Sequence, residues 1–263
     1  MIKLVAVTPE RHVGKVWKHV VDYAFAAENN VIPLLGAELD KAAVVMPIGF
    51  CNLDAGYQLV AITSLQPGIN LYVAPDGQWL SEHIPVSLRA HPFQLAQQES
   101  AEEFFLCIDE ASGLVVESED DGNAFFDNQD QPTQKIKDIL NFLLGVKAGL
   151  AVTQKAVDAL ADAGLITPWE INLKQGEQAM PVKGLSRIDE AALNKLDDEN
   201  FLAVRKAGGL AVAYAQLMST NRIKLLERLG QYQDDIAKQA AKPEPGSLGD
   251  FSLSADAGQL TFE

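Results

Sequence analysis

The sequence predicts an α+β protein with a mainly antiparallel sheet in the N-terminal half, a helical C-terminal half and a flexible acidic C-terminal tail. β-type runs separated by short turns precede about Asp130, and apolar residues at helical spacing begin after Thr133. Residues 250–263 alternate in polarity and contain no lysine or arginine. We expect a β-rich part over residues 1–132, a helical part over 133–241 packed on it in one compact unit, and a flexible tail over 242–263.

The predicted strands are short and are separated by turn residues. An apolar alternating segment begins the chain, and three further runs follow one another through turns that contain proline and glycine. The four runs are Ile2–Val7, Val44–Phe50, Tyr57–Leu65 and Ile69–Val73. Short turns favour an antiparallel meander over strands joined by crossover helices. We expect a hairpin of Phe104–Asp109 with Leu114–Glu117.

The predicted helices lie mostly after Thr133. Apolar residues recur at helical spacing from Ile136 to Leu144 and again over Val152–Leu160, and we expect the second run to end at Gly164. A short strand is expected within Leu165–Leu173, and helices within 190–207 and 210–239 on either side of Gly208 and Gly209. One short helix is also expected between Pro85 and Pro92.

Composition excludes several classes of function. The formal charge is −15 at pH 7, and a phosphate backbone would be repelled, so we expect no nucleic-acid partner. No apolar run reaches the roughly 20 residues of a membrane-spanning helix. The first residues do not resemble a secretory signal, so the expected location is the cytoplasm. Cys51 and Cys107 lie in apolar runs and are expected to be free buried thiols.

Candidate binding residues concentrate between Ile69 and Asp109. This segment combines prolines, a tight Pro-Asp-Gly turn, an aromatic side chain, an arginine and histidines. Its candidates are Trp79, His83, Arg89, His91 and Phe93. Loops of this kind often carry binding residues, so we expect the Trp79–Phe93 corner to line the main concave surface.

The same segment permits a second interpretation, an enzyme or a divalent-metal protein. His83, His91, Asp109 and Glu110 could supply general acid–base chemistry or metal ligands. Their spacing is not diagnostic, and the chain has no phosphate-binding glycine loop, zinc-type histidine pair or nucleophile elbow. We therefore favour a non-catalytic binding protein and predict neither a cofactor nor a metal site.

Three further segments leave alternatives open. Ser186 could cap a helix whose first turn contains Asp189 or Glu190, whereas Arg187 could instead bind a carboxylate of a partner. The acidic stretches 120–123 and 127–130 could bind Ca²⁺ but do not fit its twelve-residue loop, which favours solvated loops. The tail could be disordered or could add a strand to a sheet edge of a partner or a second copy.

Several ordered blocks make the chain resemble the SapC-like family, which is named for proteins linked to transport of surface-layer proteins. The blocks include NNVIPLLGAELDKAAVVMPIGF, NLYVAPDGQWLSEHIPVSLRAHPFQL, LCIDEASG and PWEI, and a fifth starts at SRIDEAALNKL. They extend from about Asn29 to Ser219. Gln78, Ala90 and His91 depart from the pattern expected there.

The resemblance implies a soluble accessory protein in export, assembly, uptake or modification of surface proteins or peptides. It also implies a protein or peptide partner, with halogenase-like and hydroxylase-like proteins as candidates. It supplies no catalytic residues.

Overall fold

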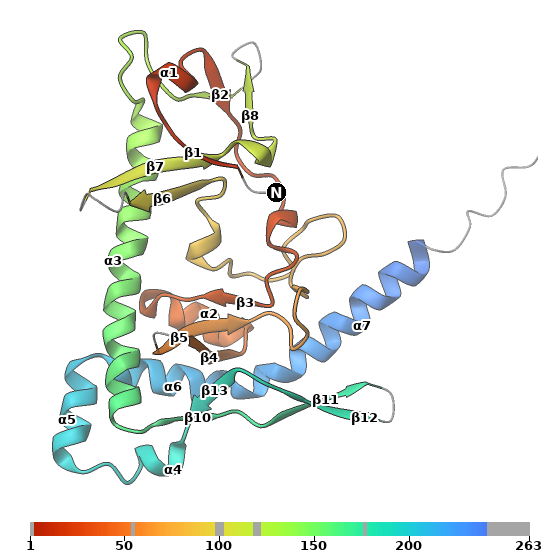
Figure 1. Cartoon of the computed structure of the whole chain (residues 1–263). Coiled ribbons are helices and arrows are strands. Elements are labelled where there is room, and N and C mark those ends of the chain that lie inside the picture. The colour runs from red at the N-terminus through yellow and green to blue at the C-terminus, as the bar shows by residue number, and fades with distance from the viewer. Residues whose placement is uncertain (1–2, 54–55, 98–102, 118–121, 176–177, 241–263) are drawn as a thin grey trace, which may run out of the picture.

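The computed structural model describes residues 3–53, 56–97, 103–117, 122–175 and 178–240. Two groups of strands lie one above the other in Figure 1, and the long helix α3 runs along both of them. The strands are β1 (Leu4–Ala6), β2 (Lys15–Trp17), β3 (Val31–Pro33), β4 (Ile48–Leu53), β5 (Gly56–Ile62), β6 (Phe93–Gln97), β7 (Phe104–Asp109), β8 (Val115–Glu117), β9 (Asn123–Ala124), β10 (Ile166–Pro168), β11 (Ile171–Gln175), β12 (Gln178–Val182) and β13 (Leu185–Ile188).

The α-helices increase in number toward the C-terminus. They are α1 (Pro9–His12), α2 (Leu39–Val45), α3 (Gln134–Asp162), α4 (Glu190–Leu193), α5 (Asp198–Lys206), α6 (Gly209–Ser219) and α7 (Ile223–Ala240). Short 3₁₀ turns include η1 (Ala24–Ala26), η3 (Val86–Leu88) and η4 (Glu110–Ser112). The predicted α+β class is confirmed, with antiparallel sheets mostly before residue 133 and helices mostly after it.

The strands form four antiparallel sheets within the described residues. The upper part holds a sheet of order β1-β7-β6 and a small sheet of order β8-β2-β9. The lower part holds a five-stranded sheet of order β10-β13-β4-β5-β3, and β11 and β12 form a separate hairpin. β6 and β3 are therefore edge strands of their sheets, which matters for the site described below.

Each part has its own hydrophobic core. The lower core centres on β4 and β5, covered by α2, α6 and the C-terminal half of α3. The upper core contains Trp17, Phe93, Ile108, Phe125 and Ile136. Each core draws residues from both sides of residue 132. The division at residues 132 and 241 stays a prediction.

α3 connects the two cores as a single helix, although its sequence reads as two periodic runs. Its buried residues are Ile136 near its start and Thr153, Ala156, Val157 and Leu160 near its end. Its middle turns bury no side chain, because they cross the space between the cores. The helix stops where predicted, since Gly164 adopts a left-handed φ of 67° that favours glycine.

One predicted strand and one predicted hairpin are wrong. Ile69–Val73 forms no strand, because Asn70 fixes the segment as a turn: its Nδ2 donates to Ala26 O and its Oδ1 accepts from Tyr72 N. β7 does not form a hairpin with residues 114–117. Both edges of β7 already pair, with β1 and β6, so β8 pairs with β2 instead.

Three helical predictions need correction. The expected helix between Pro85 and Pro92 is only the 3₁₀ turn η3. Ser186 caps no helix, because it lies in β13 opposite Phe50 of β4; the N-cap of α4 is Asp189, whose side chain accepts from Ala192 N. The expected helix over 210–239 is broken at Thr220–Arg222 into α6 and α7.

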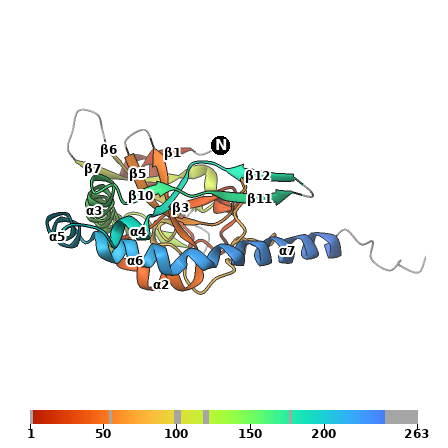
Figure 2. The same ribbon diagram turned by 90° about the horizontal axis from the view of Figure 1, so that it is seen from below.

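α7 and the β11–β12 hairpin extend from the lower part to the same side of the molecule (Figure 2). Among the described residues, no helix has the length and apolarity needed to cross a membrane. Cys51 and Cys107 are free, as predicted, with Cys107 buried and Cys51 half-buried. The tail prediction concerns residues 242–263, which lie outside the described residues.

Candidate functional site

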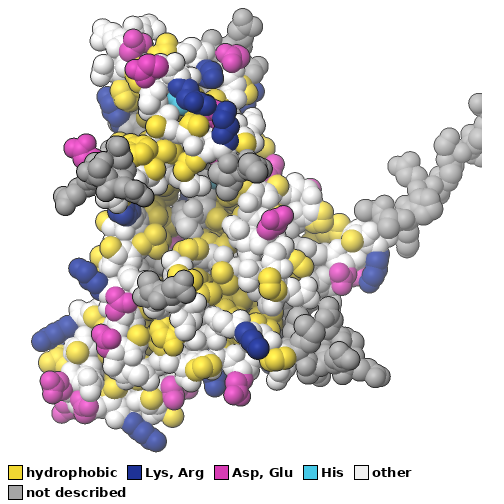
Figure 3. Space-filling model, in the orientation of Figure 1, with side chains coloured by type: hydrophobic (Ala, Val, Ile, Leu, Met, Phe, Trp, Pro, Cys, Tyr) yellow, Lys and Arg dark blue, Asp and Glu magenta, His cyan; other side chains and the backbone are white. Residues whose placement is uncertain are grey.

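A groove with a volume of about 800 Å³ lies between the upper and lower parts. Figure 3 shows the surface hollowed below the upper part, with hydrophobic side chains along its sides. Its walls come from 20–25 and β3, from η3 and β6, from residues 109–114, and from the middle of α3. The groove therefore lies where the two cores leave α3 uncovered.

The edge strands of two sheets, β6 and β3, border this groove. Edge strands expose backbone N–H and C=O groups that can pair with another chain. Asp109 N, at the end of β7, donates to the O atom of Pro92, the residue before β6. Along antiparallel strands, residues that bond to the neighbouring strand alternate with residues that do not, so Leu95 directs its N–H and C=O away from β7. In β3, Thr63 N donates to Asn30 O, so Val31 directs its backbone groups away from β5. Both Leu95 and Val31 line the groove.

A histidine with two nearby carboxylates lies on the groove wall. The imidazole of His91 stacks on the Phe25 ring with centroids 3.7 Å apart and an interplanar angle of 3°. Burial lowers the pKa of His91, and the charges of Asp109 and Asp22 oppose that shift. Because burial is the larger effect, the imidazole is neutral at pH 7.

The groove is apolar on its α3 side. Leu143, Val146 and Leu150 follow helical spacing, line the groove and are half-buried. Val21, in the 20–25 wall, is 90% exposed and adds an apolar side chain to the groove lining. Most pockets that bind organic ligands combine such apolar walls with a few polar groups.

The charged groups of the groove are acidic. Asp22 and Asp109 are its carboxylates, and the described lining residues include no lysine or arginine. Asp109 is 8% exposed, and its Oδ1 accepts from Lys3 N at 2.7 Å and Ala111 N at 3.0 Å. Asp22 uses Oδ1 to accept from Ala24 N at 3.0 Å. Both side chains are thus held in place by backbone hydrogen bonds.

The structure separates the residues that sequence analysis singled out. His91 and Phe93 line the groove, whereas Trp79, His83 and Arg89 do not. Trp79 Nε1 donates to His83 O, His83 Nε2 lies 2.8 Å from Glu38 Oε2, and Arg89 donates to Ile84 O through Nε and Nη2. These three side chains therefore shape the 79–89 segment.

Arg187 lies far along the chain and lines a different pocket, next to Glu170 and Asp189. Its side chain is exposed. The structure does not bring it to the groove.

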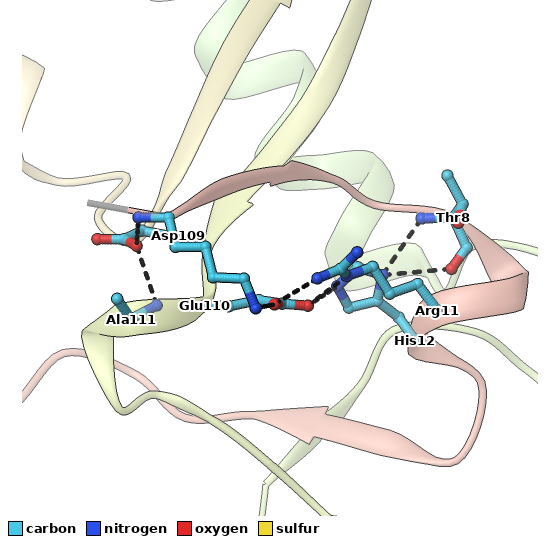
Figure 4. A network of polar contacts seen from close by, with 7 residues as sticks. Thr8, Arg11, His12, Asp109, Glu110 and Ala111 are labelled. Carbon is cyan, nitrogen blue, oxygen red and sulfur yellow. Dashed lines mark hydrogen bonds and ion pairs between the residues drawn. The ribbon is translucent and has the colours of Figure 1, made fainter. Parts of the chain in front are cut away.

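Glu110 does not line the groove and belongs to a charged network with Arg11 and His12 (Figure 4). It accepts a bidentate pair from Arg11, at 2.6 and 2.7 Å, and contacts Lys3 Nζ at 2.8 Å. The Arg11 and Lys3 hydrogen bonds hold the pKa of Glu110 at about 2. Nε2 of the buried His12 lies 3.8 Å from Glu110, and burial lowers the pKa of His12.

The four residues of the enzyme interpretation are therefore not one site. Only His91 and Asp109 share the groove. Over the ranges that the structure describes, no three His, Cys, Asp or Glu side chains could together hold a metal ion. In the acidic stretch 127–130, Asp127 Oδ1 accepts from Gln129 N and Gln131 N, which makes it a turn residue. Residues 120 and 121 of the other stretch lie outside the described residues.

A family model named SapC matches residues 7–226 of the chain, most of its length. The chain belongs to the SapC family. The resemblance predicted from the sequence blocks is confirmed. No curated protein and no solved structure matches the chain.

The whole groove falls within the SapC match, because its lining residues lie between 20 and 150. His91, one of the departures from the expected SapC pattern, is on its wall. Residues 242–263 lie beyond the match.

Several groove residues of this SapC protein were not identified from the sequence. Phe25 and Asp22 lie in a segment without a motif, and Leu143, Val146 and Leu150 follow the same helical spacing as core residues. One signal could have found the last three. A helix as long as α3 can pack against two separate cores at its two ends, so its central turns need not be buried.

Proposed function

We propose that this SapC-family chain is a non-catalytic binding protein that holds a peptide or protein segment in the groove between β6 and β3. It acts as an accessory in export, assembly, uptake or modification of surface proteins or peptides. The observation that carries the proposal is that one groove contains the outward-facing backbone groups of Leu95 and Val31, on two edge strands, together with a half-buried apolar helix face.

The hydrogen bonds that already occupy two of the polar candidate residues support a binding function over a catalytic one. A catalytic group must be free to contact the substrate, whereas Arg89 and His83 are occupied by Ile84 O and Glu38. The cytoplasmic location and the halogenase-like or hydroxylase-like partners stay predictions.

The test uses a library of random peptides displayed on phage and selected on the full chain. Selected peptides are then synthesised with a fluorescent label, and their affinity is measured by fluorescence anisotropy. Val146→Arg should weaken binding by about tenfold or more, because it places a long charged side chain on the apolar groove wall. Val152→Arg is the matched control, since Val152 lies on the same helix, is 66% exposed and does not line the groove.

Equal affinity of the two variants for every selected peptide would show that the groove is not the binding site. A circular dichroism melt of both variants establishes that neither substitution unfolds the chain.

A second candidate function is peptide hydrolysis with His91 as general base. The specific observation in its favour is a neutral imidazole in the groove near two carboxylates. Water would add across a peptide bond, giving one new carboxylate and one new amine. Mass spectrometry of a selected peptide decides: cleavage by wild type but not by His91→Gln supports catalysis, and an intact peptide after prolonged incubation excludes it for that peptide.

A further inference from the structure

We propose that the occupant of the groove is an extended segment rich in lysine or arginine alternating with apolar residues. It adds as a strand to β6 at Leu95, and a cationic side chain lies near Asp22 and Asp109. This inference rests on the proposed binding function and names the chemical class of the ligand.

The bound segment is expected to pair with β6 and not with β3. This strand has five residues, whereas β3 has three and ends at Pro33, which has no N–H and whose carbonyl accepts from Ser87 Oγ. An added strand would therefore exchange its main hydrogen bonds with Leu95, whose backbone groups point away from β7.

The position of α3 is the reason why we expect apolar and cationic residues to alternate in the bound segment. Successive side chains of a strand point to opposite faces, and α3 contacts β6 on one face. Every second residue of the added strand would face Leu143, Val146 and Leu150, which favours apolar side chains there. The residues between them would point the other way.

The preference for positive charge comes from the lining. Asp22 and Asp109 are carboxylates at the groove, and none of the described lining residues is a lysine or arginine that could neutralise them. Burial lowers the pKa of the His91 imidazole, which also lines the groove, so this side chain does not offset the two negative charges at pH 7. A ligand lysine or arginine would complement this field, whereas an acidic ligand would be repelled.

The acidic tail of the chain is therefore not the occupant that we propose. Residues 243–263 contain Glu244, Asp250, Asp256 and Glu263 and no lysine or arginine. Its predicted docking on an edge strand would have to use a different surface.

The experiment measures fluorescence anisotropy with two labelled peptides, one of alternating valine and lysine and one of alternating valine and glutamate. The wild-type full chain should prefer the lysine peptide by about tenfold or more at low salt, and the preference should shrink at high salt. Asp22→Asn should weaken lysine-peptide binding by roughly 3- to 10-fold, because it removes one charge and keeps the oxygen that accepts from Ala24 N.

Asp127→Asn is the matched control. Asp127 also accepts a backbone N–H two residues ahead, from Gln129, but it lies outside the groove. This variant should bind the lysine peptide like wild type. Two lysine peptides N-methylated on alternate sets of amides test strand addition, since only the set that faces β6 should abolish binding.

Equal binding of the lysine and glutamate peptides, or no effect of Asp22→Asn, would overturn the charge preference. Equal binding of both N-methylated peptides would overturn strand addition. Neither result affects the proposed function, which fails only if Val146→Arg leaves the binding of selected peptides unchanged.

Discussion

Nε2 of His83 lies 2.8 Å from Oε2 of Glu38, and both side chains are buried. The same Glu38 accepts from Val86 N through Oε2 and from Leu35 N through Oε1, both at 2.9 Å. One carboxylate thus connects the start of α2 to the 83–86 segment, which leads into the groove.

Replacement of Glu38 should be strongly destabilising. Glu38→Ala leaves the buried Leu35 N–H, the part-buried Val86 N–H and the His83 imidazole without their acceptor, which should lower the free energy of unfolding by about 3–5 kcal/mol. Glu38→Gln keeps one acceptor oxygen and should cost less. Urea unfolding measures both variants, with the exposed Glu28→Ala as control. The bridging role is wrong if Glu38→Ala is as stable as the control.

Glu110 should make stability depend on pH in the acid range. Its pKa is lowered from 4.5 to about 2, so the stabilisation is complete above about pH 4.5 and is lost as the pH falls toward 2. Glu110→Gln should cost about 1 kcal/mol near neutral pH, and the difference from wild type should vanish near pH 2. Urea unfolding of wild type and Glu110→Gln between pH 2 and pH 7 measures this difference in the free energy of unfolding.

The neighbouring Glu10→Gln serves as control, because Glu10 is exposed. A difference between wild type and Glu110→Gln that stays constant from pH 7 to pH 2 would contradict the role of the Arg11 and Lys3 contacts.

Gly209 should not tolerate a methyl group. A Cβ at this position would lie 2.9 Å from Val204 Cγ1 and 3.2 Å from both Ala156 O and Leu160 Cγ, where α5, α6 and α3 meet. Gly209→Ala should therefore cost about 1–3 kcal/mol through overpacking. Gly145→Ala in α3 meets no atom within 4 Å and should stabilise by up to about 1 kcal/mol through helix propensity.

Thermal unfolding of the two glycine variants checks the prediction. If both shift the melting temperature in the same direction, packing at the α5–α6 junction is not the reason for Gly209.

Gln216 should be needed to join α6 to the five-stranded sheet. This fully buried side chain accepts from Ile188 N at 3.0 Å and donates to Ile48 O at 3.3 Å, so it bridges β13 and β4. Gln216→Leu leaves both buried backbone groups unpaired and should cost about 1–3 kcal/mol. The exposed Gln231→Leu in α7 is the control, and equal denaturation midpoints would refute the bridge.

The sequence alone determined the local features of this protein. Helical spacing identified the two periodic runs that α3 joins and its end at Gly164, and glycine marked the start of β5 and the break before α6. These features depend on propensity, periodicity and backbone freedom, which act between residues close together in the chain. The ordered sequence blocks likewise identified the SapC family.

Only the tertiary structure decided which elements pair and where a groove remains. β7 lies between β1 and β6 instead of pairing with its neighbour β8, because pairing partners are chosen by burial and register across the whole chain. His83 was predicted as a ligand residue and pairs with Glu38, 45 positions away. Leu143, Val146 and Leu150 have the spacing of core residues and are half-buried. Leu143 packs against the upper core, whereas Val146 and Leu150 belong to neither core, because the two cores are separated along α3.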